Sequence, residues 1–188
     1  MRDLSLHILD IMQNSTAAQA SLIRATLRVK PETGMLVVII KDDGSGMDKK
    51  LLAVVTDPFT TTRTTRKVGL GIPLFKASAE RSGGSFEIES HRGAGTVVSA
   101  EFEIANIDRP PLGDLAGVIT DMAAAWPKTD IQLNLENGDA RFEFSSHEAA
   151  GILGDVPLSE FTVVKWLRGY IYDGISEIFG GVLNEIDS

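Results

Sequence analysis

Two neighbouring segments rich in β-branched and aliphatic residues dominate the first quarter of the sequence. They span residues 21–29 and 35–41, and the intervening Lys-Pro-Glu-Thr-Gly at 30–34 is typical of a turn. We therefore predict a β-hairpin. Residues 85–90 and 96–104 alternate apolar and polar side chains around a glycine-rich turn, and they predict a second hairpin.

Segments with helical spacing surround these hairpins. Residues 4–18 place apolar side chains on one face after Asp3, a predicted N-cap, and residues 48–55 and 70–81 predict two further helices. The order αββααββ predicts a two-layer α/β sandwich, in which a mixed, mostly antiparallel sheet is covered by helices on one face. The threonine-rich residues 57–68 have no useful periodicity, and we predict that they form a mobile lid.

The Asp-Arg-Pro-Pro segment at 108–111 is stiff and cannot continue a strand, so we place a domain boundary there. The first unit is predicted to span residues 1–108. Residues 112–188 are predicted to form a smaller, separate acidic α+β unit. Its predicted elements are a helix at 112–126, strands at 130–136 and 140–146 joined by Asn137-Gly138, and a helix at 159–179.

The net charge of −8 is unevenly distributed along the chain. Residues 1–110 carry a net charge of +1 and residues 111–188 a net charge of −9. The acidic half argues against nucleic acid as a partner, and it suits either solubility or a basic protein partner. The oligomeric state is left open.

The chain has no cysteine, which excludes disulfides and thiolate chemistry. Its apolar stretches are far shorter than the ~20 residues that a membrane helix needs, and no signal segment is evident. We therefore expect no membrane association and a cytoplasmic location.

Asp10 and Asn14 lie four residues apart on the first predicted helix, one turn apart on one face, with His7 a turn further back. A carboxylate can orient or deprotonate a water molecule, and an amide oxygen suits Mg²⁺. The alternative is a solvated helix face. His91 and His147 lie in separate turns and do not predict a metal site.

The second polar segment follows directly on the apolar strand at 35–41. It reads Asp-Asp-Gly-Ser-Gly-Met at 42–47, where the glycines allow a ligand to approach the backbone. The carboxylate of Asp42 could accept a hydrogen bond from the exocyclic amine of adenine, and a purine ring could lie beside Met47. An ordinary acidic turn is the alternative.

Two further segments carry anion-binding features. Arg63, Arg66 and Lys67 precede Gly-Leu-Gly-Ile at 69–72, where basic side chains and free N–H groups meet a helix N-terminus. This is neither a P-loop nor a Rossmann fingerprint, and a plain helix-starting loop is the alternative. Residues 93–96 offer backbone donors and the Thr96 hydroxyl, although a hairpin turn also needs such residues.

In order and spacing, these four segments resemble the N box and the three glycine boxes of the GHKL ATPases, the superfamily of gyrase, histidine kinases and MutL. The stretch at 10–20 is particularly similar to MutL, and Pro-Phe-Thr-Thr-Thr-Arg at 58–63 is similar to histidine-kinase lids. The resemblance covers residues 4–104.

The resemblance implies an ATP site with Mg²⁺. It implies that Asn14 coordinates Mg²⁺, that Asp42 binds the adenine amine and that Thr96 contacts the nucleotide nearby. Lys67 and Arg66 are the candidates for the phosphates, and Asp10 occupies the catalytic-acid position. The remaining implied pocket residues are Gly44, Gly46, Met47, Gly69, Leu70 and Gly71. Hydrolases of the family usually carry Glu where Asp10 stands, so slow hydrolysis is expected.

Three functions follow from this resemblance. One is a slow ATPase or ATP-driven switch whose lid alters binding of a protein partner. Another is a serine protein kinase of the anti-sigma type, and the third is a non-enzymatic adaptor stabilised by ATP. We expect no phosphoacceptor hairpin before Asp10, so His7 is expected at the surface or behind the pocket.

Overall fold

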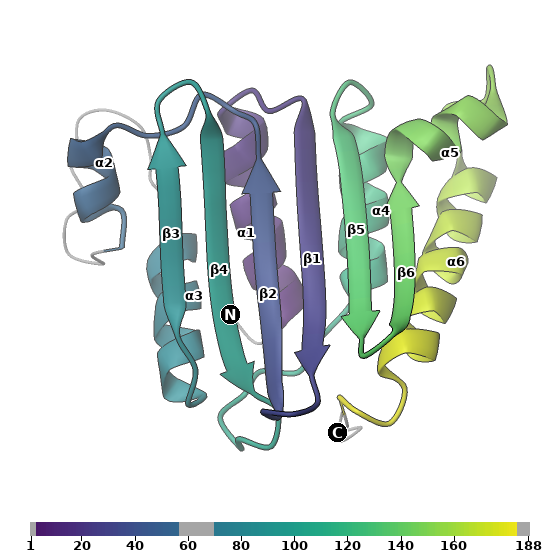
Figure 1. Ribbon diagram of the computed structural model, residues 1–188. Coiled ribbons are helices and arrows are strands. Elements are labelled where there is room, and N and C mark those ends of the chain that lie inside the picture. The colour runs from purple at the N-terminus through teal and green to yellow at the C-terminus, as the bar shows by residue number, and fades with distance from the viewer. Residues whose placement is uncertain (1–2, 57–69, 184–188) are drawn as a thin grey trace.

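The computed structural model describes residues 3–56 and 70–183 (Figure 1). The helices are α1 (Leu4–Ala17), α2 (Lys49–Val54), α3 (Gly71–Arg81), α4 (Leu115–Ala125), α5 (Ser146–Leu153) and α6 (Phe161–Phe179). The strands are β1 (Leu22–Lys30), β2 (Met35–Asp42), β3 (Phe86–His91), β4 (Gly95–Glu103), β5 (Asp130–Asn137) and β6 (Ala140–Ser145). The strands form one sheet in the order β3-β4-β2-β1-β5-β6.

Helix α1 begins where its sequence predicts. The carboxylate of Asp3 accepts a hydrogen bond from the N–H of Leu6 at 2.9 Å, as an N-cap does. Four apolar side chains at helical spacing then turn to the sheet and are at most 3% exposed: Leu4, Ile8, Ile11 and Met12. The predicted amphipathic helix is therefore confirmed, and its inner face fixes which side of the sheet is covered.

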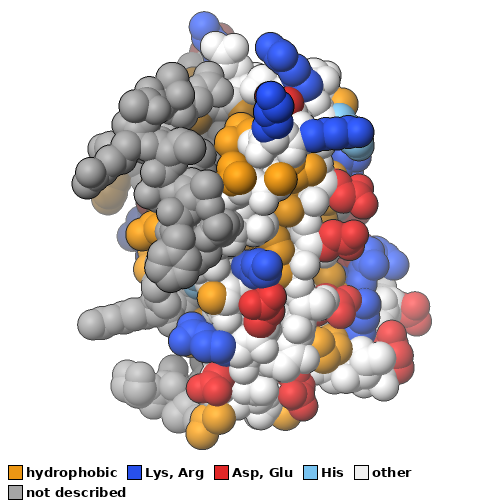
Figure 2. Space-filling model, turned by 90° about the vertical axis from the view of Figure 1, so that its left-hand side faces the viewer, with side chains coloured by type: hydrophobic (Ala, Val, Ile, Leu, Met, Phe, Trp, Pro, Cys, Tyr) orange, Lys and Arg blue, Asp and Glu red, His pale blue; other side chains and the backbone are white. Residues whose placement is uncertain are grey.

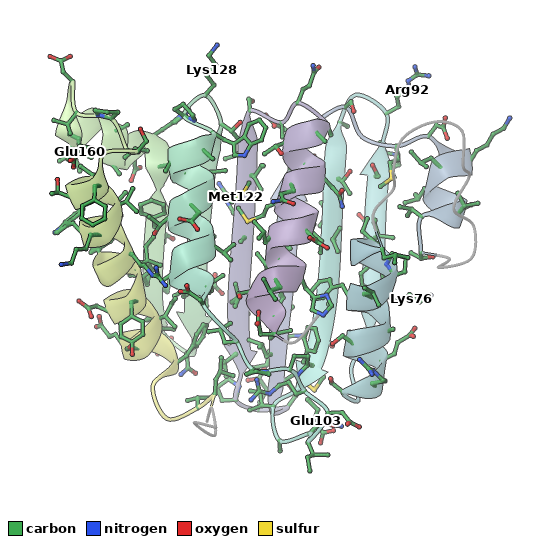
Figure 3. The ribbon with its side chains drawn as sticks, turned by 180° about the vertical axis from the view of Figure 1, so that it is seen from behind. Lys76, Arg92, Glu103, Met122, Lys128 and Glu160 are labelled. Atoms are coloured by element: carbon green, nitrogen blue, oxygen red, sulfur yellow. The ribbon has the colours of Figure 1, made fainter. Side chains whose placement is uncertain are left out.

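Both predicted hairpins are present, and the strands alternate between a covered and an open face. On the covered face, Ile40 of β2 lies between Ala25 of β1 and Val98 of β4, and all three are buried. Helices α1, α3, α4 and α6 lie on that face (Figures 1 and 3). The open face carries charged pairs such as Lys30–Glu101 at 2.7 Å. This arrangement confirms the predicted mixed α/β fold with helices on one face.

Residues beyond the predicted boundary extend the same sheet. Strand β5 pairs in parallel with β1, from Leu22 opposite Asp130 to Val29 opposite Asn137, and this pairing makes the sheet mixed. On the covered face Met122 of α4 points toward α1 (Figure 3) and is buried. Apolar residues before and after 108 thus share one hydrophobic core. The division into units 1–108 and 112–188 stays a prediction.

Helix α5 was not predicted, because its sequence lacks an apolar stripe. Ser145 caps it by accepting a hydrogen bond from the N–H of Glu148, and within the helix only Ser146 is buried. The other predicted elements are present with boundaries shifted by up to three residues, as at α4, where Asp114 is the N-cap. No helix in the described ranges is long and apolar enough to cross a membrane.

Charge on the outer surface is mixed at the end of the molecule formed by α2, β3 and α3. Figure 2 looks onto this end, and in the lower half of the view lysine and arginine side chains are interspersed with acidic ones. On α3, Lys76 and Glu80 form an ion pair at 3.9 Å. Such exposed pairs contribute little to stability.

Candidate functional site

A cavity of about 260 Å³ lies between α1 and the ends of β2 and β4, with α2 and the start of α3 beside it. Its walls are mainly apolar, and a few polar side chains enter it. The lining residues are Ile11, Asn14, Ser15, Ala17, Ala18, Asp42, Ser45, Gly46, Met47, Leu51, Val55, Ile72, Thr96 and Val98. Two larger hollows, of about 420 and 410 Å³, contain none of the predicted site residues.

Asp42 is the buried acid of this cavity, with 7% of its surface exposed. It is the last residue of β2, in register with Ile23 of β1 and Thr96 of β4. One carboxylate oxygen accepts a hydrogen bond from the Ser15 hydroxyl at 2.6 Å, and the other accepts one from the Gly44 N–H at 2.9 Å. These two donors fix the carboxylate in the cavity wall.

The neighbouring Asp43 has a different role. Its carboxylate accepts hydrogen bonds from the N–H groups of Ser21 and Leu22 at 2.8 and 2.9 Å, and also from the Ser21 hydroxyl. Burial acts to raise the pKa of Asp43, but these hydrogen bonds outweigh it and hold the pKa below its ordinary value. Asp43 therefore ties the loop to the start of β1, and only Asp42 lines the cavity.

The glycines of this loop allow close approach to two neighbouring segments. Gly46 has φ +62°, and a Cβ there would lie 2.0 Å from the carbonyl oxygen of His91. A Cβ on Gly44 would lie 2.9 Å from the Cβ of Ala18 on the other side. The loop at residues 42–47 is thus packed closely between the end of α1 and the β3–β4 turn, and this packing fixes the position of the cavity wall.

Ser90 joins three parts of the site. Its hydroxyl accepts the N–H of Met47 at 2.8 Å, donates to the carbonyl of Gly95 at 3.0 Å and lies 2.9 Å from the Thr96 hydroxyl. Sequence reasoning missed both Ser90 and Ser15. The signal for Ser15 was its place after Asn14 on the inner face of α1. Ser90 shares the covered strand face with Ile88, but a lone serine there carries no recognisable pattern.

Asp10 lies beside the cavity and is not among its lining residues. It packs against the first residue of α3, since a Cβ on Gly71 would lie 3.0 Å from both Cβ and Oδ2 of Asp10. The carboxylate thus faces the N-terminus of α3, where free N–H groups and the helix dipole favour negative charge. Asn14, one turn further along α1, lines the cavity.

The structure brings together Asn14, Asp42, Gly46, Met47 and Thr96 at the cavity, with Gly44 directly behind Asp42. Leu70 is 54% exposed and does not line it. Three further site predictions, Arg66, Lys67 and Gly69, lie outside the described residues, as does the lid predicted at 57–68.

His7 is buried, which excludes the surface position and leaves the other expected position, behind the pocket. Its side chain is 2% exposed, and its ring centroid lies 5.3 Å from that of Phe75 on α3. Nδ1 has no hydrogen-bond partner among the described residues. Burial, assisted by nearby positive charge such as Arg81, lowers the pKa of His7 to about 4. The imidazole is therefore neutral at pH 7 and belongs to the α1–α3 packing.

A preformed metal site is not found in residues 3–56 and 70–183, where no group of three or more His, Cys, Asp and Glu side chains could hold an ion. The amide oxygen of Asn14 at the cavity wall could supply one ligand to a metal ion.

A comparison with protein families matches residues 2–106 to the family described as histidine kinase-, DNA gyrase B- and HSP90-like ATPases. The matched segment contains α1, the cavity and the strands β1 to β4.

The chain is also similar to proteins named as sensors and sensor kinases. A sensor protein of Shewanella frigidimarina is 36% identical over 75 residues, which are 39% of this chain and 12% of that protein. A C4-dicarboxylate sensor kinase of Bacillus subtilis is 28% identical over 79 residues, 42% of this chain and 15% of its own. An NtrY-like sensor histidine kinase of Rickettsia conorii is 26% identical over 86 residues, which are 46% of this chain and 14% of that protein. The matches therefore span about an eighth to a seventh of these relatives.

Proposed function

Because this chain belongs to the histidine kinase-, DNA gyrase B- and HSP90-like ATPase family, we propose that its cavity binds ATP with Mg²⁺ and that the nucleotide acts as a slowly hydrolysed regulatory switch. The observation that carries the proposal is the buried Asp42 carboxylate in the wall of a mainly apolar cavity. The cavity is smaller than the about 300–1,000 Å³ of pockets that enclose whole ligands. We therefore assign it to the base, with the phosphates outside.

Adenine fits the chemistry of this cavity. An ionised carboxylate offers about four lone-pair positions, and Ser15 and Gly44 use two of those on Asp42. The remaining capacity can accept a hydrogen bond from the exocyclic amine of adenine. Apolar side chains such as Ile72, Met47 and Val98 would contact the faces of the ring. Guanine carries a carbonyl at the corresponding position, so the same carboxylate would disfavour it.

The phosphates would lie toward Asn14 and the N-terminus of α3. Mg²⁺ prefers oxygen ligands and is usually held jointly by the protein and the phosphates. The Asn14 amide oxygen would supply one protein ligand, and the free N–H groups at the start of α3 would meet an anion. Arg66 and Lys67 are proposed as the basic partners of the phosphates. Asp10, beside Gly71, would orient the attacking water.

Titration with Mg²⁺-ATP tests the site directly. We expect Asp42→Asn to weaken ATP binding by at least about tenfold, because the loss of one charge-assisted hydrogen bond costs about 1.5–3 kcal/mol. Asn14→Ala should weaken ATP binding only when Mg²⁺ is present. Asp43→Asn is the matched control, since that carboxylate points to Ser21 and should leave the affinity unchanged. Unchanged affinity in both Asp42→Asn and Asn14→Ala would overturn the proposed site.

A second candidate function is transfer of the γ-phosphate to a protein, as in the serine kinases of the anti-sigma type. The relatives named as sensor kinases favour it. A basic protein would suit the acidic residues 111–188 as a partner. Incubation with γ-labelled ATP and candidate proteins separates the two functions, because transfer leaves the label on protein and hydrolysis releases it as phosphate. Release as phosphate in the presence of every partner would favour the switch.

A further inference from the structure

Helix α6 has two opposite faces of different character. Its inner face carries a buried stripe that packs on α4 and the sheet: Val163, Leu167, Ile171, Gly174 and Ile178. The opposite face consists of exposed residues at helical spacing: Thr162, Lys165, Trp166, Gly169, Tyr172, Asp173 and Ser176. Trp166 and Tyr172 are 61% and 64% exposed, which is unusual for two large aromatic side chains on one helix face.

The exposed face of α6 is arranged symmetrically about Gly169. Trp166 and Tyr172 lie three residues before and after this glycine, while Lys165 and Asp173 lie four residues before and after it. A Cβ on Gly169 would meet nothing within 4 Å, so this position is open to close approach from outside. If a second copy of the helix ran in the opposite direction with its Gly169 opposite this one, Trp166 would therefore meet Tyr172 and Lys165 would meet Asp173.

The charges on this face are available for a partner. Within the described residues, neither Lys165 nor Asp173 has an opposite charge within salt-bridge distance, whereas Arg168 on the flank is paired with Asp114. The indole of Trp166 is held by stacking on Tyr170, with ring centroids 5.6 Å apart and 7° between the planes. Tyr170 in turn packs on Phe142 of β6 at 5.2 Å. The surface is thus preorganised.

We propose that a second copy of this chain docks antiparallel along α6, with the two-fold axis at Gly169. Lys165 of each copy then faces Asp173 of the other, and each Trp166 packs beside the other copy's Tyr172. A two-fold interface must be self-complementary, and this face meets that requirement in charge, in aromatic content and in its glycine at the crossing point. The contact from Thr162 to Ser176 is about 20 Å long at 1.5 Å per residue.

The proposed dimer leaves the nucleotide cavity accessible. Glu160, the N-cap of α6, lies at the opposite end of the sheet from Lys76 of α3 (Figure 3). The cavity borders β4 and β2, whereas α6 packs on β5 and β6, so the two sites lie over different strands of the sheet. The contact is short and each copy carries a net charge of −8, so we expect a weak dimer that needs physiological salt to screen the repulsion.

Charge exchange between Lys165 and Asp173 is the decisive experiment. Sedimentation velocity over about a hundredfold range of concentration should show a reversible monomer–dimer equilibrium for the wild type. Lys165→Asp and Asp173→Lys should each raise the dissociation constant by at least about tenfold, because each creates two like-charge contacts. An equimolar mixture of the two variants should associate again, since both 165–173 contacts of the mixed dimer then join an aspartate to a lysine.

Two further measurements test the geometry. Gly169→Leu should weaken dimerisation, whereas Gly151→Leu on α5 is the matched control, because a Cβ there also meets nothing within 4 Å. In a Trp126→Phe background, the emission of Trp166 should shift to shorter wavelength as the dimer forms. A wild type that stays monomeric over the whole range, or single variants that dimerise as the wild type does, would overturn the proposal. ATP affinity is expected to be the same in Gly169→Leu and wild type.

Discussion

In the proposed hydrolysis of ATP, Asp10 would act on the attacking water, and the length of its side chain decides whether it reaches that water. Its carboxylate lies against Gly71 beside the cavity, and it is one methylene shorter than the glutamate usual in related hydrolases. We expect Asp10→Asn to lower kcat for Mg²⁺-ATP by about a hundredfold, as removal of a general base does. Asp10→Glu should raise kcat, because the longer side chain extends further toward the γ-phosphate.

The affinity of these two variants for ATP should stay close to that of the wild type, because Asp10 does not line the cavity. A steady-state phosphate-release assay together with ATP titration checks both expectations. If Asp10→Asn and wild type release phosphate at the same background rate, the chain binds ATP without turning it over through this residue.

His7 makes stability depend on pH in a defined window. Its pKa is lowered from 6.5 to about 4 in the folded protein, so the unfolded chain binds the proton more readily. The contribution of the neutral His7 to the unfolding free energy is fully present above pH 6.5 and is lost as the pH falls toward 4. We expect about 2 kcal/mol of the unfolding free energy to disappear between pH 7 and pH 4.5 on this account.

Urea unfolding at the two pH values measures this loss, with His7→Phe as the comparison. Phenylalanine preserves the ring packing against Phe75 and cannot titrate, so the fall between pH 7 and 4.5 should shrink by the same amount. His91 and His147 are both exposed and stay in both proteins. An identical pH dependence in both proteins would show that His7 is not the source.

The sequence could predict the site residues that belong to contiguous motifs, because spacing along a helix or a glycine turn carries that information. Asp42 and Asn14 meet at the cavity for this reason. Burial of a single polar residue depends on what packs over it, which a local pattern does not contain. His7 under α3 and Ser90 beneath Met47 are cases of that kind.

At the scale of the elements, the loop after β2 depends on the backbone conformation of Gly46. This residue has φ +62° and lies in contact with the carbonyl of His91, which a Cβ would approach to 2.0 Å. We expect Gly46→Ala to lower the unfolding free energy by more than about 2 kcal/mol, since it adds a backbone clash to the left-handed strain. ATP binding should weaken as well, because Gly46 lines the cavity.

Gly34→Ala is the control that separates the two causes. Gly34 has φ +65°, but a Cβ there meets nothing within 4 Å, so only the conformational strain applies. We expect a loss of about 1–2 kcal/mol with ATP affinity unchanged. Thermal unfolding and ATP titration of both variants provide the comparison. Equal losses of unfolding free energy in Gly46→Ala and Gly34→Ala would mean that the β3–β4 turn moves to make room for the new side chain.

Most elements could be predicted because their periodicity and their end signals agree. Asp3 caps α1 as expected, and Asp48 caps α2 where that helix was predicted to begin. The turn between β5 and β6 contains Gly138, directly after Asn137 at the end of β5. Helix α5 escaped prediction because it lies mostly in solvent and owes its start to the Ser145 cap. The parallel pairing of β1 with β5 also escaped, since it joins residues about 108 apart and no local pattern encodes such a pair.

At the scale of the whole molecule, the pairing of β1 with β5 joins the half of the chain that carries the proposed nucleotide site to the C-terminal half. Strand β1 lies between β2, which ends at Asp42, and β5, and the apolar residues of both halves share one core. Trp126 and Trp166 both lie beyond residue 112 and are the only tryptophans in the chain. At concentrations below those at which the proposed dimer forms, their fluorescence therefore reports the state of residues 112–188.

We expect Mg²⁺-ATP to raise the thermal midpoint of this tryptophan signal, although the nucleotide would bind some distance away on α1 and β2. At a hundredfold excess over the dissociation constant, binding adds about 2.7 kcal/mol, which corresponds to about 5–10 °C for a chain of this size. Helix content measured by circular dichroism should move with it, because one shared core unfolds cooperatively. The Asp42→Asn variant should show neither shift. If ATP moved only part of the circular dichroism transition and left the tryptophan signal in place, the two halves would unfold separately, and the predicted division at 108–112 would be a thermodynamic boundary despite the continuous sheet.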